Sequence, residues 1–460
     1  MGRKRQPSQW VLASPEGAAG ETQGAPERVE PPVAVPAVER PATAERLMER
    51  VVENRNVKEA LRRVQANRGA PGVDGMTVQR LGRYLKHHWT TIREQLLTGT
   101  YRPQPVKRVE IPKPGGGVRV LGIPTALDRF VQQAVLQVLQ PAWDATFSEH
   151  SFGFRPKRSA HQAVAQAQAY LGEGYGWVVD IDLEQFFDRV NHDLLMGRVA
   201  KRVTDKRVLK LIRAFLSAGM MLGGVVIPRG QGTPQGGPLS PLLANLLLDD
   251  LDRELERRGH RFVRYADDCN LYVRSERAGQ RVMASVTRFL ERKLKLKVNA
   301  EKSAVAKPQQ RKFLGFSFTR EAQPRRKLAR QTVERFKREV RQRTRPSRGR
   351  SLEQIVRKLT EYLRGWRGYY GFCQTRSELE SLDEWIRRRL RCVAWRQWKR
   401  GPKRYAELRK RGVPPDWAAT TAGSPRGPWH LSHSPALTRA FPNAYFAQLG
   451  LLSLAAPNRA

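Results

Sequence analysis

Cysteine, acidic side chains and long apolar runs are all scarce in this chain of 460 residues. Its three cysteines, Cys269, Cys373 and Cys392, form no closely spaced pair. This spacing excludes a structural zinc site built on CxxC knuckles and indicates free thiols in a reducing compartment. No apolar run approaches the roughly 20 residues that span a bilayer, and the opening MGRKRQPSQW lacks the apolar core of a secretion signal. We therefore expect a cytoplasmic protein with no membrane partner.

The shortage of acids leaves a large excess of positive charge. Lys and Arg number 84 against 43 Asp and Glu, so the formal net charge is +41. A compact chain with this charge repels itself unless something anionic lies against it. Nucleic acid is the natural counter-charge, because phosphate neutralisation supplies most non-specific affinity. The alternative, charge kept for solubility, is weaker because excess positive charge serves solubility poorly.

Composition and periodicity divide the chain. Residues 1–43 are rich in Pro, Ala, Gly and Glu and are expected to form a disordered leader. Helical periodicity then runs from about Ala44 to the loop GAPGVDG, and a second helix is expected over 76–100. VKRVEIPKP, GGG and VRVLGIP predict a hairpin, and RFVRYADDCNLYVRS predicts another. GWVVDIDLEQFFDRV predicts a strand that runs into a helix. The central part is therefore expected to be an α+β sheet with helices on one side.

The tail of the chain differs in composition. From Arg320 to Arg411 there are 30 Lys and Arg against 10 Asp and Glu, a net +20, interleaved with Trp and Tyr. This pattern favours a basic helical domain. Arg364 and Arg367 offer phosphate contacts and the aromatic rings offer stacking faces for unpaired bases. The alternative is a helical core with a solvated basic face. Residues 401–460 are turn-rich and are expected to form a small appended domain.

Acids are concentrated at two places in this basic chain. VVDIDLEQFFD holds Asp180, Asp182 and Asp188, and YADD holds Asp267 and Asp268. Each motif follows an apolar strand. Carboxylates brought together at strand ends can hold the paired Mg²⁺ ions used for in-line phosphoryl displacement. Adjacent acids repel each other, and a cation would remove the repulsion. A lone Asp at a strand end is more often a turn former or a helix cap, and this reading stays open for Asp180 and Asp188.

The series of motifs resembles the group II intron reverse transcriptase/maturase family. In order, they are GAPGVDG, IPKPGGGVRVLGIP, FSEHSFGFRP, DIDLEQFFD, QGTPQGGPLSPLLANLLLDDLD, FVRYADD, LKVNAEKS, FLGF and LRGWRGYYGF. The resemblance implies a right-hand polymerase, with fingers and palm over 44–320 and an all-α thumb/maturase domain over 321–400. Residues 401–460 would then form a small C-terminal nucleic-acid-binding domain. The chain resembles the compact subgroup without an HNH endonuclease domain.

The same resemblance implies roles for individual acids and one lysine. The family pattern D-x-x-x-F-F falls on Asp182, and its YADD acids fall on Asp267 and Asp268. These three are expected to hold two Mg²⁺ ions, with Asp267 the stronger ligand of its pair. Lys302, in VNAEKS, resembles the lysine near the leaving pyrophosphate and could act as an acid or an electrostatic clamp. The competing interpretation of Lys302 is a plain surface lysine.

Further positions are expected to contact nucleotide or primer. Phe187 resembles the steric gate under the sugar, where a bulky ring admits deoxyribose and excludes a 2′-hydroxyl; the alternative is an ordinary core phenylalanine. Gly315, in FLGF, resembles the primer grip. For Lys113 a solvated hairpin edge is nearly as good an interpretation. The positions expected to bind the incoming nucleotide are Lys113 and Arg119 of the Gly-rich hairpin, Phe187, and Gln235 and Gly236 of the QGG loop.

The leading functional hypothesis is an RNA-directed DNA polymerase encoded by a group II intron. Its expected partners are an RNA template with a DNA primer, dNTPs, the intron RNA whose splicing it assists, and the target DNA of retrohoming. Three alternatives stay open at this point: a domesticated reverse transcriptase in host or phage defence, an RNA-binding splicing maturase with an idle polymerase, and an RNA-dependent RNA polymerase. Intact acids at 182, 267 and 268 argue against the idle polymerase, and Phe187 argues against the RNA polymerase.

Overall fold

The computed structural model describes residues 46–112, 117–222, 225–227, 230–233, 236–345 and 349–456, without the side chains of Arg119 and Leu222. The expected leader, Lys113 and Gln235 lie outside the described residues. The helices of the first part are α1 (Leu47–Val51), α2 (Asn54–Ala66), α3 (Val78–Thr98), α4 (Ala126–Asp144), α5 (Ala160–Gly172), α6 (Phe186–Arg189), α7 (His192–Ala200), α8 (Lys206–Ser217), α9 (Ser240–Arg257), α10 (Glu276–Lys293) and the 3₁₀ helix η1 (Pro308–Gln310). Those that follow are α11 (Arg330–Arg343), α12 (Leu352–Tyr370), α13 (Arg376–Gln397), α14 (Gly401–Lys410), α15 (Pro415–Ala422), α16 (Pro428–Leu431), α17 (Pro435–Ala440) and α18 (Asn443–Gln448). The strands are β1 (Val106–Pro112), β2 (Val118–Ile123), β3 (Trp177–Ile181), β4 (Met220–Leu222), β5 (Val225–Ile227), β6 (Arg261–Tyr265), β7 (Asp268–Val273), β8 (Ala304–Ala306), β9 (Phe316–Phe318) and β10 (Arg326–Leu328).

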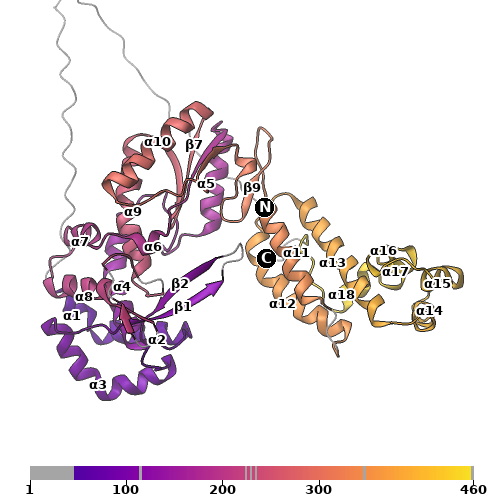
Figure 1. Ribbon diagram of the computed structural model, residues 1–460, viewed down its shortest axis with the longest axis horizontal. Coiled ribbons are helices and arrows are strands. Elements are labelled where there is room, and N and C mark those ends of the chain that lie inside the picture. Colours follow the sequence, from indigo (N-terminus) through magenta and orange to yellow (C-terminus); the bar gives the residue numbers. More distant parts are fainter. Residues whose placement is uncertain are drawn as a thin grey trace, which may run out of the picture. The chain divides into compact units, whose positions relative to one another are not determined.

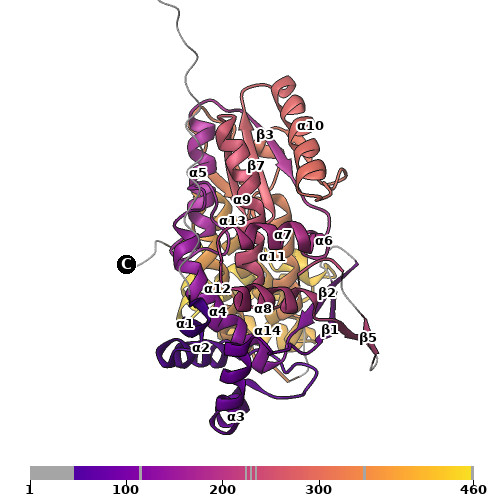
Figure 2. The ribbon, with the colours of Figure 1, turned by 90° about the vertical axis from the view of Figure 1, so that its left-hand side faces the viewer.

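The central sheet is antiparallel, with strand order β6-β7-β3-β8. Successive side chains of a strand point to opposite faces, and β3 is apolar on both. Val178 packs with residues of α5 in one cluster, whereas Val179 packs with residues of α9 and α10 in another. The expectation of helices on one side of the sheet is therefore wrong, because two consecutive buried valines require cover on both faces (Figures 1 and 2).

A second sheet, the hairpin sheet, has strand order β2-β1-β4-β5. The predicted hairpin around the triple glycine is confirmed, since β1 and β2 pair antiparallel from Lys107 with Ile123 to Pro112 with Val118. β4 pairs with β1 in parallel, and β5 pairs antiparallel with β4 at the edge of the sheet. The helix expected over 76–100 is confirmed as α3. The helical stretch that begins near Ala44 is divided into α1 and α2, because Glu53 takes an extended conformation at the start of α2.

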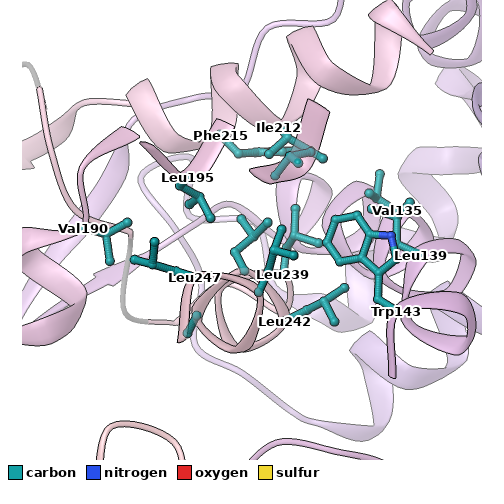
Figure 3. Close-up of a cluster of buried hydrophobic side chains, with 14 of the residues drawn as sticks. Val135, Leu139, Trp143, Val190, Leu195, Ile212, Phe215, Leu239, Leu242 and Leu247 are labelled. Carbon is teal, nitrogen blue, oxygen red and sulfur yellow. The ribbon is translucent and has the colours of Figure 1, made fainter. Parts of the chain in front are cut away.

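Helices α4, α7, α8 and α9 share one apolar core (Figure 3). Leu195 and Leu247 are fully buried in it, and Trp143 is 2% exposed. α4 begins at a cap in which the Thr125 hydroxyl accepts from the backbone N–H of Asp128 at 3.0 Å, which satisfies a donor left free by the first turn. This core fixes α4 and α9 under the loop 236–239 and so supports one wall of the cleft described below.

The helices that follow residue 328 have a core of their own. It runs from Leu328 to Leu454 and includes residues from both sides of position 400. α12 begins with a capping box in which Ser351 and Gln354 satisfy each other's backbone N–H groups. The helical character expected for the basic tail is confirmed. In the part of the chain that the structure describes, no helix combines the length and the apolar character needed to cross a membrane.

Trp395 tests how much the second core contributes to stability. Its side chain is 1% exposed, and its ring lies 6.0 Å from that of Trp398. Trp395→Ala should lower the free energy of unfolding by about 3–5 kcal/mol, because the lost apolar contacts leave a cavity. Trp417→Ala is the control: this ring is 46% exposed, and its removal should change stability by less than about 0.5 kcal/mol. Equal effects of both variants in urea titrations would contradict the assigned core.

Candidate active site

Strands β3 and β7 bring the two acidic motifs together. Their last pair is Ile181 with Cys269, so Asp182 and Asp268 follow at the same end of the ladder. Tyr265 pairs with Asp268 and leaves a two-residue turn, Ala266–Asp267, between β6 and β7. Asp267 and Asp268, from the second motif, thus lie beside Asp182, from the first. Motifs more than 80 residues apart converge because the two strands are neighbours.

A cleft of about 1070 Å³ opens over these acids. Among the predicted site residues, its lining includes Asp182, Phe187, Gly236, Asp267, Asp268 and Lys302. A second cleft of about 1280 Å³ shares Asp182, Asp268 and Lys302 with the first and extends along Gly315 to residues of α11 and α12. The carboxylates therefore lie where the two clefts meet. This arrangement lets an elongated ligand reach the acids from both sides.

The turn 299–303 is bonded directly to Asp182. The Ser303 hydroxyl accepts from the backbone N–H of Asp182 at 3.0 Å, and the Asp182 carbonyl accepts from the N–H of Asn299 at 2.9 Å. The Asn299 side chain accepts from the N–H of Lys302 at 3.3 Å and shapes the turn. Lys302 Nζ lies 3.9 Å from Asp182 Oδ1, with 65% of its side chain exposed. Its ammonium is therefore close to the acids and accessible from the clefts.

Electrostatic repulsion is concentrated at Asp268. The pKa of Asp268 is raised to about 6, first by burial and then by neighbouring carboxylates, with Asp267 foremost. Burial also raises the pKa of Asp180, and the Arg311 guanidinium opposes that rise. Arg311 Nη2 lies 2.6 Å from Asp180 Oδ2 and the same group donates to the Lys302 carbonyl. Arg311 thus joins β3 to the turn that bears Lys302.

The donor set suits a hard divalent cation. Carboxylate oxygens are the ligands that such ions prefer, with waters and substrate phosphates completing the shell. A bound cation would favour the charged form of Asp268 and remove the repulsion that raises its pKa. Within the described ranges, no group of three or more His, Cys, Asp and Glu side chains is arranged to hold a metal ion. The carboxylates that could contribute ligands in the cleft are those of Asp182, Asp267 and Asp268.

Phe187 and Gly236 also line the first cleft. Gln185, two residues before Phe187, has a φ of 50° in the left-handed region. The Phe187 carbonyl accepts a hydrogen bond from the N–H of Thr233 at 2.6 Å. Gly236 has φ of 139°, and a Cβ there would lie 2.9 Å from the carbonyl oxygen of Gly122. Only glycine fits this approach without strain. The backbone of Arg119 belongs to β2, whereas its side chain is outside the description.

Gly315, Arg364 and Arg367 lie in different surroundings. Gly315 lines the second cleft with φ of 87°, and a Cβ there would lie 2.8 Å from the Tyr370 hydroxyl. Packing against Tyr370 is therefore one reason for glycine at this position. Arg364 is exposed on α12. Arg367 is partly buried, and its Nη2 donates to the Ala456 carbonyl at 2.5 Å. Part of its guanidinium group is therefore engaged in a contact within the protein.

Several polar residues of the first cleft were not predicted from the sequence. They form two pairs, each with members four residues apart: Arg63 of α2 with Asn67, the residue that caps the end of that helix, and Arg129 with Gln133 of α4. Helical spacing could have placed each pair on one face. Nothing in the sequence indicates that these faces meet the acids. Arg129 also donates to the Ala70 carbonyl at 2.7 Å and so holds the GAPGVDG loop.

Comparison with known proteins defines the class first. A family model for reverse transcriptase (RNA-dependent DNA polymerase) matches residues 111–318, which contain the acids and the first cleft's loop 236–241. A model for the group II intron maturase-specific domain matches residues 333–412. The chain is thus an RNA-directed DNA polymerase followed by a maturase-type domain. It belongs to the group II intron reverse transcriptase/maturase family.

The chain is similar to several individual proteins over part of its length. Protein YkfC of Escherichia coli (strain K12) is 34% identical over 301 residues, which cover 57% of this chain and 79% of that protein. The group II intron-encoded protein LtrA of Lactococcus lactis subsp. cremoris is 30% identical over 291 residues, 49% of this chain and 48% of LtrA. The chain thus matches about half the length of LtrA. Among solved structures, a partial Cas6-RT-Cas1–Cas2 complex gives a TM-score of 0.36 at 26% identity, covering 54% of this chain and 43% of that one.

The repulsion at Asp268 can be tested without a ligand. Asp267→Asn removes the foremost neighbouring charge and should lower the pKa of Asp268 from about 6 toward the ordinary value near 4, without reaching it, because burial is the larger cause. Carboxyl ¹³C NMR of aspartate-labelled protein measures this pKa. Asp193→Asn is the control, since Asp193 is 85% exposed and pairs with Arg213. An unchanged Asp268 titration in Asp267→Asn would show that Asp267 does not contribute to the rise, and would leave burial and the carboxylates of Asp180 and Asp182 as its causes.

Proposed function

We propose that this chain copies RNA into DNA at Asp182, Asp267 and Asp268, with two Mg²⁺ ions as cofactors. The observation that carries the proposal is the convergence of Asp182 and Asp268 at one end of the β3–β7 ladder, beneath a cleft of about 1070 Å³. The raised pKa of Asp268 supports it, because the folded chain retains a repulsion that bound cations would remove. dNTPs and a primed RNA template are the proposed substrates.

Each residue has a proposed part in the reaction. Asp182 and Asp267 hold the cations, and Asp268 holds them or the primer end. Bound cations would activate the primer hydroxyl and stabilise charge on the leaving pyrophosphate. Lys302, close to Asp182 and exposed to both clefts, neutralises or protonates the leaving group. Lys113, Arg119 and Gln235 remain proposed contacts of the incoming nucleotide.

The choice of sugar is assigned to Phe187. Its ring lines the cleft with Asp182 and lies 5.1 Å from the buried ring of Phe186, in an edge-on arrangement that limits its movement. A constrained ring beside the acids would clash with a ribose 2′-hydroxyl. Gly236 gives the neighbouring loop close backbone approach to the nucleotide, and Gly315 does the same for the primer.

The helical part is proposed to bind the folded intron RNA and the target DNA, and so to assist splicing and retrohoming. Its charge supports this, as do aromatic side chains that are exposed beside basic ones. Trp417 is 46% exposed, and Arg388 lies 4.2 Å from the centroid of the partly exposed ring of Trp429. Exposed rings can stack on unpaired bases while guanidinium groups contact phosphates. Arg364 and the outward part of Arg367 are further proposed RNA contacts. These substrates imply action in the cytoplasm and at the nucleoid.

Primer extension tests the acids. Asp182→Asn and Asp267→Asn keep the size of the side chain but remove a ligand charge. Each should lower the rate of DNA synthesis on a primed RNA template with dNTPs and Mg²⁺ by more than about 100-fold, since even indirect partners of metal ligands cost 10- to 100-fold. Asp193→Asn, a charge loss at an exposed ion pair, should leave the rate unchanged.

Two outcomes would overturn parts of this proposal. Full activity in both cleft variants would remove these acids from the catalytic site. A wild-type chain that extends no primer and yet promotes intron splicing would favour the idle-polymerase maturase. Splicing assays with the same preparations separate these outcomes.

The sugar gate has its own test. Phe187→Ala should increase incorporation of ribonucleotides relative to deoxyribonucleotides by about 10-fold or more, because the ring no longer meets the 2′-hydroxyl. Phe154→Ala is the matched control, since Phe154 lines the same cleft and is 47% exposed. The ratio of kcat/KM for a dNTP and its rNTP is the measured quantity. An unchanged ratio in Phe187→Ala would exclude Phe187 from the gate.

A further inference from the structure

Arg264 lies fully buried directly behind the turn that bears Asp267 and Asp268. Both it and its partner Asp252, on α9, are 0% exposed. The guanidinium forms a fork with the carboxylate, at 2.7 Å from Nε and 2.5 Å from Nη2. Its remaining nitrogen, Nη1, donates to the Ala266 carbonyl at 2.9 Å. A charged pair so completely removed from water is costly unless further hydrogen bonds satisfy its polar groups, and here Nη1 makes one such bond to the turn itself.

A second observation concerns the FSEHSFGFRP motif, residues 147–156, to which the proposed function assigns no role. Arg264 exchanges backbone hydrogen bonds with it: the Arg264 N–H donates to the His150 carbonyl, and the Phe152 N–H donates to the Arg264 carbonyl, each at 2.9 Å. Gly153 then lies against the turn, where a Cβ would be 2.2 Å from the Ala266 nitrogen. The motif is thus the outer support of the turn.

Asn245 connects the two supports. It is 1% exposed on α9. Its side-chain oxygen accepts from Arg264 Nη1 at 3.0 Å, and its amide donates to the Gly153 carbonyl at 2.8 Å. Helix α9, strand β6 and the 147–156 loop therefore meet at one closed set of bonds around Ala266. Removing any member leaves a buried polar group without its partner.

The turn requires such support for two reasons. Ala266 has φ of 58°, a left-handed conformation that side-chain-bearing residues seldom adopt without external restraint. The two acids that follow it carry like charges and would move apart if the turn were free. The bond from Arg264 to the Ala266 carbonyl acts on the residue immediately before Asp267. It restrains the backbone without touching a ligand oxygen.

We propose that Arg264, held by Asp252 and Asn245, is a positioning residue that fixes the Ala266–Asp267 turn in the geometry that catalysis requires, with Gly153 as the opposing surface. This inference rests on the proposed function of Asp267 and Asp268. It assigns a role in rate and cation binding to residues that contact neither substrate nor cation. Groups that hold metal ligands from behind commonly change affinity or activity 10- to 100-fold when removed.

The test replaces the whole ion pair. Arg264→Met with Asp252→Leu removes both charges together, and apolar replacement of a buried pair often leaves folding intact. The double variant should retain its affinity for primed template and its KM for dNTP within about 3-fold, while kcat falls 10- to 100-fold. Binding of Mn²⁺, followed by the loss of the free-ion EPR signal, should weaken in parallel. Arg207→Met is the control, since Arg207 joins Glu49 and Asp205 by bonds of 2.8 and 2.9 Å away from both clefts; it should lower Tm and leave kcat and Mn²⁺ binding unchanged.

A second variant leaves the ion pair untouched. Gly153→Ala pushes on the Ala266 nitrogen and should also lower kcat, whereas Gly176→Ala, whose added Cβ meets nothing within 4 Å, should not. If the double variant fails to fold, this pair decides the question. Wild-type kcat and Mn²⁺ binding in either Gly153→Ala or the folded double variant would overturn the positioning role. A wild-type chain without primer extension would instead refute the proposed function, and Mn²⁺ binding would still report on the turn.

Discussion

Mutual repulsion among carboxylates at the end of β3 and β7 is the constraint on which the rest of the structure depends. Folding alone favours separating buried like charges, yet here burial and neighbouring acids together raise the pKa of Asp268 to about 6. The chain holds these groups together with bonds that come from distant segments. Arg311 neutralises Asp180, the turn 299–303 binds the backbone of Asp182, and Arg264 restrains the turn before Asp267. The repulsion that remains is available to favour a bound cation.

The distribution of charge follows from the same constraint. A chain with a net charge of +41 presents its clustered acids where two clefts meet, and lines those clefts with basic residues such as Arg63 and Arg335. Such a surface attracts a phosphate backbone and leaves the anionic centre to cations. The helical part has its own core, and Tyr369 and Tyr370 of α12 also pack against the apolar cluster beneath the central sheet.

Much of the local structure could be predicted from the sequence. The alternating apolar runs around GGG and YADD predicted both hairpins correctly. Such strand pairs are specified locally, by the residues of the turn and by the two-residue period of the strands. The resemblance to the family pattern D-x-x-x-F-F selected Asp182, and the structure brings it beside Asp267 and Asp268; their roles, with that of Lys302, stay predictions. Cover on only one face of the sheet was a wrong expectation. A run of apolar residues in one strand does not reveal which helices will bury its two faces.

The sequence by itself determined which chemical groups this protein carries, the order of its motifs, and membership of a family that copies RNA into DNA. Those properties depend on residue identity and on short spacings, which are visible along the chain. Only the tertiary structure decided which groups meet: Arg311 with Asp180 across 131 positions, Tyr370 against Gly315, and Arg264 behind the Ala266–Asp267 turn. Such contacts depend on strand register and helix packing. These are set by burial throughout the fold, and local sequence carries little trace of them.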